Sequence, residues 1–78
     1  MVKVKIYTTP TCPYCSAAKR FFRSLGIPFK EVDVSRNPRE AELLYRKTGQ
    51  MGVPVIEVGN QIVIGFDRPK LERLLGIS

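Results

Sequence analysis

The chain has no histidine and only two cysteines among its 78 residues. Zinc prefers four protein ligands, so a tetrahedral zinc site would require a second copy of the chain or thiols from outside it. A bridged iron–sulfur cluster would have the same requirement. Two cysteines are also too few for the framework of several disulfides that stabilises many small secreted domains. These absences direct attention to the cysteines as a reactive pair.

Long apolar runs, low-complexity tracts and internal repeats are missing as well. The first residues alternate apolar and basic side chains, and neither a long apolar segment nor a small-residue cleavage site follows them. We therefore expect no signal peptide and no transmembrane span. A closely spaced cysteine pair in a chain without a leader points to a reducing compartment, so the expected location is the cytoplasm.

The composition is that of an ordinary folded protein, with 44% hydrophobic and 26% charged residues. We expect one small domain that spans residues 1–78 and acts as a monomer. Thirteen basic residues against seven acidic ones give a net charge of +6, which attracts acidic surfaces in general. The basic residues are dispersed and no recognition motif accompanies them, so we expect neither a nucleic-acid partner nor a membrane partner.

The first half of the chain has the pattern of a strand, a helix and a second strand. Apolar residues alternate with basic residues and Tyr7 over residues 2–7, which predicts a strand with one better-buried face. Helical spacing of apolar residues follows over residues 13–25, and a short strand-forming segment covers residues 29–34. A strand, helix and strand that are joined tightly form a right-handed βαβ unit with a parallel pair.

The second half predicts a helix, a hairpin and a last short helix. Asn37 as N-cap and Glu40 at the third helical position have the form of a capping box. The inner face of this helix is expected to hold Ala41, Leu44, Tyr45 and Thr48. Two apolar strands then flank the turn residues 59–60, and Asp67 is a suitable N-cap for the last helix.

Both cysteines lie in the segment Thr11-Cys12-Pro13-Tyr14-Cys15, between the first predicted strand and the first predicted helix. With Cys12 as N-cap, Pro13 takes the first helical position, where its missing N–H costs nothing. The Cys12 sulfur would accept hydrogen bonds from the backbone N–H groups of Tyr14 and Cys15, at the positive end of the helix dipole. Both effects favour a thiolate. Cys15 lies within reach of that sulfur, so the pair is able to open and close as a disulfide.

Two other interpretations compete with a redox role for the pair. A purely structural disulfide would close a ring of four residues and would therefore restrict little of the unfolded chain. A cysteine-ligated metal ion or iron–sulfur cluster, carried in a bridged dimer, is the alternative function. Visible absorbance after anaerobic reconstitution would identify such a cluster.

Several motifs together resemble the glutaredoxin branch of the thioredoxin-like superfamily over nearly the full length of the chain. They are Cys12-Pro13-Tyr14-Cys15 after the first strand, Val53-Pro54, the Gly-Asn turn, and Gly65-Phe66-Asp67 before the last helix. The resemblance implies an α/β thioredoxin-like fold with the order β-α-β-α-β-β-α. It further implies a four-stranded mixed sheet in the order 2-1-3-4, three flanking helices and a cis peptide bond before Pro54.

The same resemblance implies a thiol–disulfide oxidoreductase that binds no cofactor. Cys12 would attack a substrate disulfide as the nucleophile, and Cys15 would resolve the mixed disulfide. An extended peptide or glutathione would pair with the exposed backbone of Val53. The substrate groove would be formed by Pro13, Tyr14, Val53, Pro54, Phe66, Asp67 and Arg68. The implied partners are disulfide-containing proteins, with ribonucleotide reductase as one candidate, and either glutathione or thioredoxin reductase as the electron donor.

Three positions depart from the glutathione-dependent members of the family. Those members usually carry a lysine three residues before the first cysteine, a threonine before the Val-Pro pair, and a Gly-Gly-x-Asp-Asp run before the last helix. This chain has Thr9, Gly52 and Ile64-Gly65-Phe66-Asp67-Arg68 at these places. The Gly-Phe-Asp-Arg-Pro segment instead resembles NrdH-type redoxins and related short glutaredoxin-like proteins, which commonly take electrons from thioredoxin reductase. The electron donor therefore stays open between the two.

Overall fold

The computed structural model describes residues 3–50 and 52–77. Its helices and strands follow the predicted order. They are β1 (Val4–Thr8), α1 (Pro13–Ser24), β2 (Lys30–Asp33), α2 (Pro38–Thr48), β3 (Val55–Val58), β4 (Gln61–Ile64) and α3 (Arg68–Leu75). The predicted start of the first strand at Val2 lies outside the described residues.

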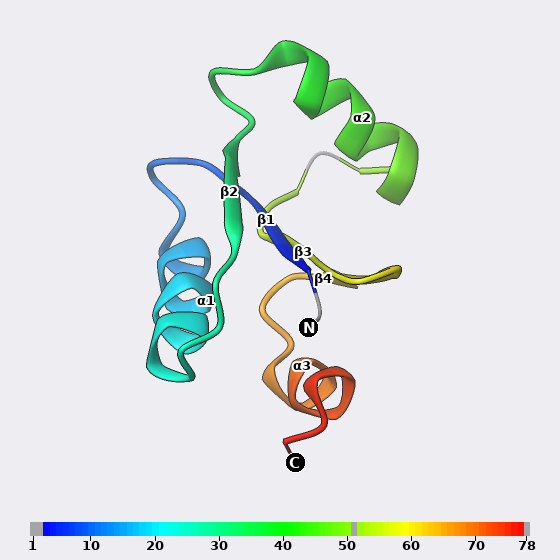
Figure 1. Ribbon diagram of the computed structural model, residues 1–78. Coiled ribbons are helices and arrows are strands. Elements are labelled where there is room, and N and C mark those ends of the chain that lie inside the picture. The colour runs from blue at the N-terminus through cyan, green and yellow to red at the C-terminus, as the bar shows by residue number, and fades with distance from the viewer. Residues whose placement is uncertain (1–2, 51, 78) are drawn as a thin grey trace.

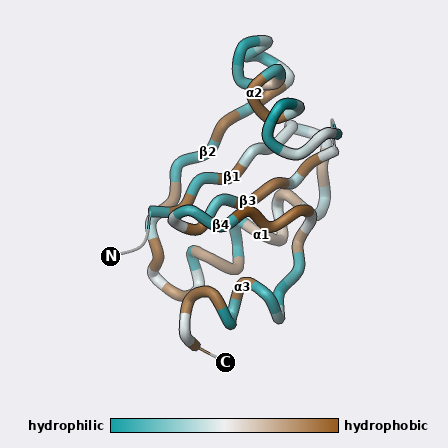
Figure 2. The backbone as a smooth tube through the Cα atoms, turned by 90° about the vertical axis from the view of Figure 1, so that its right-hand side faces the viewer, coloured by the Kyte–Doolittle hydropathy of each residue, from teal (hydrophilic) through white to brown (hydrophobic). Residues whose placement is uncertain are grey.

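The four strands form a mixed sheet in the order β2-β1-β3-β4, which confirms the implied thioredoxin-like topology. β1 runs parallel to β2 and antiparallel to β3, and β4 pairs antiparallel with β3. Figure 1 shows α1 and α3 on one side of the sheet and α2 on the other. The sheet is therefore the middle of three layers, as Figure 2 shows with α2 above the strands and α3 below them.

The residues that start the helices were predicted correctly, but one capping interaction was not. Asp67 caps α3 by accepting a hydrogen bond from the backbone N–H three residues later, at 3.2 Å. Asn37 is the N-cap residue of α2, yet its side chain makes no capping bond. Its amide instead donates to the carbonyl oxygen of Asp33 at 2.8 Å. Glu40, the other half of the predicted capping box, pairs with Lys5 at 3.4 Å.

The larger hydrophobic cluster lies between the sheet and the helices α1 and α3. Phe22 is fully buried in it and packs edge-on against Phe21, with ring centroids 5.2 Å apart. The buried members of the cluster are Val4, Ile6, Ala18, Phe21, Phe22, Ile56, Val58, Val63 and Leu71. Alternation along β1 and helical spacing along α1 predicted this face, because each element presents its apolar side to the same layer.

The opposite face of the sheet carries a second cluster, and it corrects two predictions. Tyr7, which was expected on the less buried face of β1, is fully buried beside Leu44 of α2. Its hydroxyl lies 3.3 Å from Nζ of Lys47, which donates a hydrogen bond to it. Tyr45, expected on the inner face of α2, is instead 52% exposed. α2 packs apolar side chains against the Tyr7 end of this face and meets Lys5 through the Glu40 ion pair, so the same strand is apolar and buried at one end and charged at the other.

Candidate active site

The end of β1 is held firmly where the chain leaves the sheet for the cysteine loop. Thr8 is buried, and its hydroxyl donates to Oε2 of Glu31 at 3.0 Å. The backbone carbonyl of Thr8 accepts from the N–H of Val34, also at 3.0 Å. Lys19 of α1 reaches the same Glu31 oxygen at 2.8 Å, and this contact lowers the pKa of the Glu31 carboxyl. β1, β2 and α1 are thus tied together directly beside the loop.

Cys12 occupies the predicted N-cap position of α1, with an extended backbone. Its sulfur accepts a hydrogen bond from the backbone N–H of Cys15 at 3.1 Å. The equivalent bond predicted from Tyr14 is not among the hydrogen bonds of the described residues. The first turn of α1, which is fully described, contains no acidic side chain that would oppose a negative charge on the sulfur. A hydrogen-bond donor and the helix dipole therefore both favour the Cys12 thiolate when the pair is reduced.

Cys12 and Cys15 are joined as a disulfide, with their Cα atoms 5.2 Å apart. The two cysteines differ strongly in exposure, because Cys12 is partly accessible whereas Cys15 is only 1% exposed. A large substrate disulfide can therefore approach Cys12 but not Cys15. This asymmetry suits a nucleophile at Cys12 and a shielded resolving thiol at Cys15.

The loop before β3 brings a second segment to the cysteines. The carbonyl oxygen of Val53 lies 3.9 Å from the Cys12 sulfur, although the two residues are 41 positions apart. The peptide bond between Val53 and Pro54 is cis, and Pro54 is buried. The carbonyl oxygen of Pro54 accepts from the N–H of Gly65 at 2.8 Å. This bond attaches the start of the Gly65-Phe66-Asp67 segment to the loop beside Cys12.

The other predicted site residues lie in two segments of the chain, Pro13-Tyr14 and Phe66-Asp67-Arg68. Pro13 and Tyr14 are exposed beside the cysteines, with Tyr14 69% accessible. Asp67 is occupied as the N-cap of α3. Phe66 and Arg68 both contact Phe21, a residue in the second half of α1. The structure therefore gathers Cys12, Cys15, Val53 and Pro54 at one place, and it sets Phe66 and Arg68 against Phe21.

Phe66 and Arg68 help to form a cavity of about 290 Å³ between α1 and the start of α3. The rings of Phe21 and Phe66 are 5.7 Å apart, and the Arg68 guanidinium lies 5.4 Å from the centre of the Phe21 ring. The other lining residues are Ala17, Arg20 and Ser24. The sequence analysis did not identify these three, although their spacing places them on one face of α1 together with Pro13.

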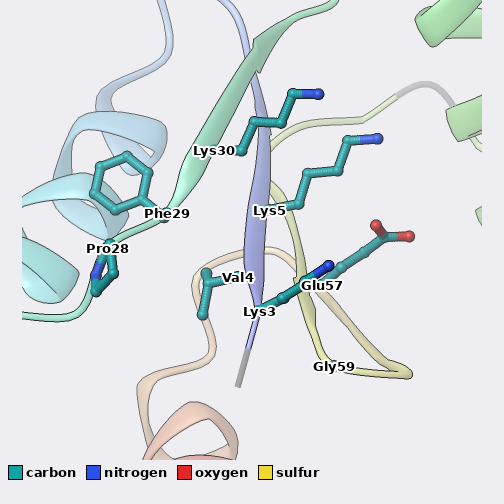
Figure 3. A pocket seen from close by; sticks show the side chains of 8 residues that line it. All are labelled: Lys3, Val4, Lys5, Pro28, Phe29, Lys30, Glu57 and Gly59. Carbon is teal, nitrogen blue, oxygen red and sulfur yellow. The ribbon is translucent and has the colours of Figure 1, made fainter. Parts of the chain in front are cut away.

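A larger cavity, of about 640 Å³, lies at the opposite end of β1 from the cysteine loop. Figure 3 shows the side chains of Lys5 and Lys30 extending side by side there, with Glu57 nearby. Lys5 and Lys30 are partners in the pairing of β1 with β2. Within residues 3–50 and 52–77, no cysteine and no residue of the Val53 loop lines this cavity. Its size alone therefore does not make it the site of thiol chemistry.

The described residues 3–50 and 52–77 contain no group of three or more cysteine, aspartate or glutamate side chains placed to hold a metal ion. Within the same ranges, no helix has the length and apolar character to cross a membrane. The chemistry visible at the site is that of two sulfur atoms, an exposed backbone carbonyl and a helix N-terminus.

Comparison with known proteins agrees with this geometry. A family model described as glutaredoxin matches residues 4–63. A glutaredoxin-like 8.6 kDa protein from the rubredoxin operon of Clostridium pasteurianum is 38% identical over 72 residues, covering 92% of this chain and 96% of that protein. Glutaredoxin 3 of Escherichia coli K12 is 37% identical over 67 residues, covering 86% of this chain and 81% of its own length.

Solved structures show the same similarity in three dimensions. The glutaredoxin-like NrdH-redoxin of Escherichia coli superimposes with a TM-score of 0.82 at 35% identity, covering 92% of this chain and 93% of that one. Its published description gives it a thioredoxin-like activity profile. A glutaredoxin from Archaeoglobus fulgidus gives a TM-score of 0.85 at 26% identity, covering 96% and 87% of the two chains.

Proposed function

Because the chain belongs to the glutaredoxin family of thiol–disulfide oxidoreductases, we propose that it reduces protein disulfides through Cys12 and Cys15. The observation that carries this proposal is the asymmetry of the pair. Cys12 is accessible, accepts the Cys15 N–H at 3.1 Å and lies 3.9 Å from the Val53 carbonyl, whereas Cys15 is buried. We further propose that residues 1–78 act as one monomeric domain in the cytoplasm.

The first step is attack by the Cys12 thiolate on one sulfur of the substrate disulfide. A bond forms between Cys12 and that sulfur, the substrate S–S bond breaks, and the second substrate sulfur leaves as a thiolate that takes up a proton. The substrate chain lies extended along Val53, whose backbone offers hydrogen bonds to any sequence. Recognition through main-chain groups suits an enzyme that accepts several protein substrates.

The second step uses Cys15 to release the product. Cys15 loses its proton and attacks the Cys12 sulfur, which breaks the mixed disulfide and frees the substrate sulfur that was bonded to Cys12 as a thiolate that takes up a proton. The protein is left with the Cys12–Cys15 disulfide that the structure contains. Two electrons have passed from the dithiol to the substrate, and a reductant must return them before the next cycle.

We propose thioredoxin reductase as that reductant in preference to glutathione. Thr9, Gly52 and Arg68 occupy the positions where glutathione-dependent members carry lysine, threonine and aspartate. Thr9 therefore offers no cation to a glutathione carboxylate. Arg68 has its guanidinium over the Phe21 ring, further along α1. The 35% identity to an NrdH-redoxin with a thioredoxin-like profile supports the same choice.

Cysteine variants test the chemistry. Cys12→Ser should abolish reduction of insulin, and Cys15→Ser should accumulate a covalent mixed disulfide with the substrate that dithiothreitol releases. Ser16→Ala, at an exposed position in the same turn, serves as the matched control and should retain activity. Equal activity of Cys12→Ser and the wild type would contradict the proposal.

A coupled assay tests the donor. NADPH consumption is followed with the oxidised protein and either thioredoxin reductase or glutathione with glutathione reductase. We expect turnover with thioredoxin reductase to exceed turnover with the glutathione system. The reverse order would overturn the choice of donor while leaving the dithiol mechanism intact.

A further inference from the structure

We propose that the groove between α1 and the start of α3 binds an acidic side chain of the protein substrate, held by Arg20 and Arg68. The groove is the cavity of about 290 Å³ floored by Phe21 and Phe66. The inference rests on the proposed disulfide reductase function and adds a substrate preference to it. The favoured substrate carries a glutamate or aspartate a few residues from its reacting cysteine.

Both walls of the groove begin at the exchange site. One wall is the face of α1 that carries Ala17, Arg20 and Ser24, and the same face begins at Pro13, directly after Cys12. The other wall is the segment containing Phe66 and Arg68. It follows Gly65, whose N–H donates to Pro54 at 2.8 Å beside the Val53 loop. A chain bound at Val53 and Cys12 therefore meets the open end of the groove.

The charges in the groove have one sign. Arg20 is exposed and forms no ion pair within the described ranges 3–50 and 52–77. Arg68 contacts Glu72 at 3.4 Å, but its side chain is 66% exposed, where such a pair contributes little. No acidic residue of the described part of the chain lines the cavity. Two guanidinium groups with donors in a fixed fork match the two oxygens of a carboxylate.

The groove has the size for one side chain and not for a cofactor. Small-molecule pockets usually measure about 300–1,000 Å³, so a cavity of about 290 Å³ is at the lower limit. The rings of Phe21 and Phe66 would contact the aliphatic stem of a glutamate while its carboxylate meets the arginines. An apolar floor below a charged rim therefore fits an acidic side chain with a methylene stem.

The helix geometry sets the distance between the acid and the reacting cysteine. Arg20 is eight positions after Cys12, which corresponds to roughly 12 Å along a helix that rises about 1.5 Å per residue. An extended chain advances about 3.3 Å per residue and covers this distance in roughly four residues. We therefore expect the preferred acid about three to five positions from the substrate cysteine.

The test compares two synthetic disulfide peptides that differ only in having Glu or Gln four positions from the cysteine. The measured quantity is the ratio of kcat/KM for the Glu peptide to that for the Gln peptide, so any general loss of activity cancels. We expect a ratio of roughly two to five for the wild type, the range of a partly exposed ion pair. The ratio should fall to about one in the double variant Arg20→Gln, Arg68→Gln. Added salt should lower the wild-type ratio because it screens exposed charges.

Arg39→Gln, an exposed arginine of α2, is the matched control and should keep the wild-type ratio. In Arg20→Glu the charge preference should reverse. A third peptide, with Lys at the varied position, should then be reduced with a higher kcat/KM than the Glu peptide. Efficient reduction of both peptides by the wild type at equal rates would overturn the groove proposal alone. A double variant that retains the wild-type ratio would overturn it as well. Reduction of neither peptide would count against the proposed function itself.

Discussion

Replacing Cys15 by proline removes the backbone N–H that, among the residues the structure describes, donates to the Cys12 sulfur. Cys15→Ala is the matched variant, because it also removes the second thiol but keeps this donor. Proline is tolerated in the first turn of a helix, where N–H groups have no intrahelical acceptor. Cys15 is the third residue of α1, and its N–H is directed at Cys12 at 3.1 Å. The pair of variants therefore isolates a single hydrogen bond.

The size of the effect follows from the charge on the acceptor. A hydrogen bond to a charged group contributes about 1.5–3 kcal/mol, and about 1.4 kcal/mol corresponds to a factor of ten in an equilibrium constant. At a fixed pH, the ratio of Cys12 thiolate to thiol should thus be roughly 10- to 150-fold lower in Cys15→Pro than in Cys15→Ala. The helix dipole acts in both proteins and cancels from the comparison.

Ultraviolet absorbance of the thiolate measures this ratio directly, because Cys12 is the remaining thiol in both variants. Far-ultraviolet circular dichroism checks that α1 is intact in the proline variant. The rate of alkylation should change less than the thiolate ratio, since a more stable thiolate is also a weaker nucleophile. A difference in thiolate ratio below about twofold, in a folded pair, would refute activation through the Cys15 N–H.

Three further outcomes concern stability. Asp67→Ala removes the cap of α3 and should lower the stability by about 1 kcal/mol, or roughly 4–8 °C in Tm by thermal unfolding. Gly65→Ala should cost about 1–2 kcal/mol because Gly65 has a φ of 82°, whereas Gly52→Ala, without such a φ, should be nearly neutral. Lys19 lowers the pKa of the Glu31 carboxyl in the folded protein below its ordinary value of 4.5. The stabilisation that ionised Glu31 contributes is therefore fully present above about pH 4.5, and it is lost as the pH falls through the lowered pKa of the folded protein. In acid titrations, the stability difference between wild type and Glu31→Gln should therefore shrink below about pH 4.5; a constant difference would contradict this.

The elements of the fold were predictable because their signals are local. Cys12 and Asp67 cap their helices through bonds that span three residues, and glycines follow the helices where the pattern ends. The hairpin between β3 and β4 also depends on adjacent residues. The capping box at Asn37 failed because the Asn37 side chain is turned towards β2, where its amide donates a hydrogen bond, and its oxygen accepts none from the helix N–H groups. The amide of Asn37 donates to the Asp33 carbonyl at the end of β2. The local sequence does not show that Asn37 bonds to this carbonyl and not to the backbone of its own helix.

The burial of the two tyrosines depends on where α2 lies. The alternation of residues along a strand gives no information about that position. Tyr7 shares its face of β1 with Lys5, yet α2 buries Tyr7 beside Leu44 and meets Lys5 through a partly exposed ion pair with Glu40. The same placement leaves Tyr45 at the solvent side of the helix. A residue pattern gives the face of an element, whereas the extent of the layer above that face is a tertiary property.

At the site, the sequence predicted the reactive pair and missed the groove beside it. Cys12 and Cys15 are recognisable because their spacing and the following proline are local. Val53 came from the family resemblance, since its contact with Cys12 spans 41 positions. In the sequence, Arg20 is one of the dispersed basic residues and Phe21 one of the helically spaced apolar residues, so neither indicated a site. Their position next to Phe66 emerges only when α3 is placed against α1.

The attachment of α2 has a consequence for how the molecule opens. Leu44 is the one buried side chain of this fully described helix, and two surface ion pairs, Lys5–Glu40 and Lys47–Glu57, join the helix to β1 and β3. Such pairs contribute at most about 1 kcal/mol each and weaken in salt. The amide hydrogens of α2 should therefore exchange with solvent through local opening well before those of α1. Because α1 lies on the opposite face of the sheet, this partial unfolding would leave the Cys12 turn in place (Figure 1).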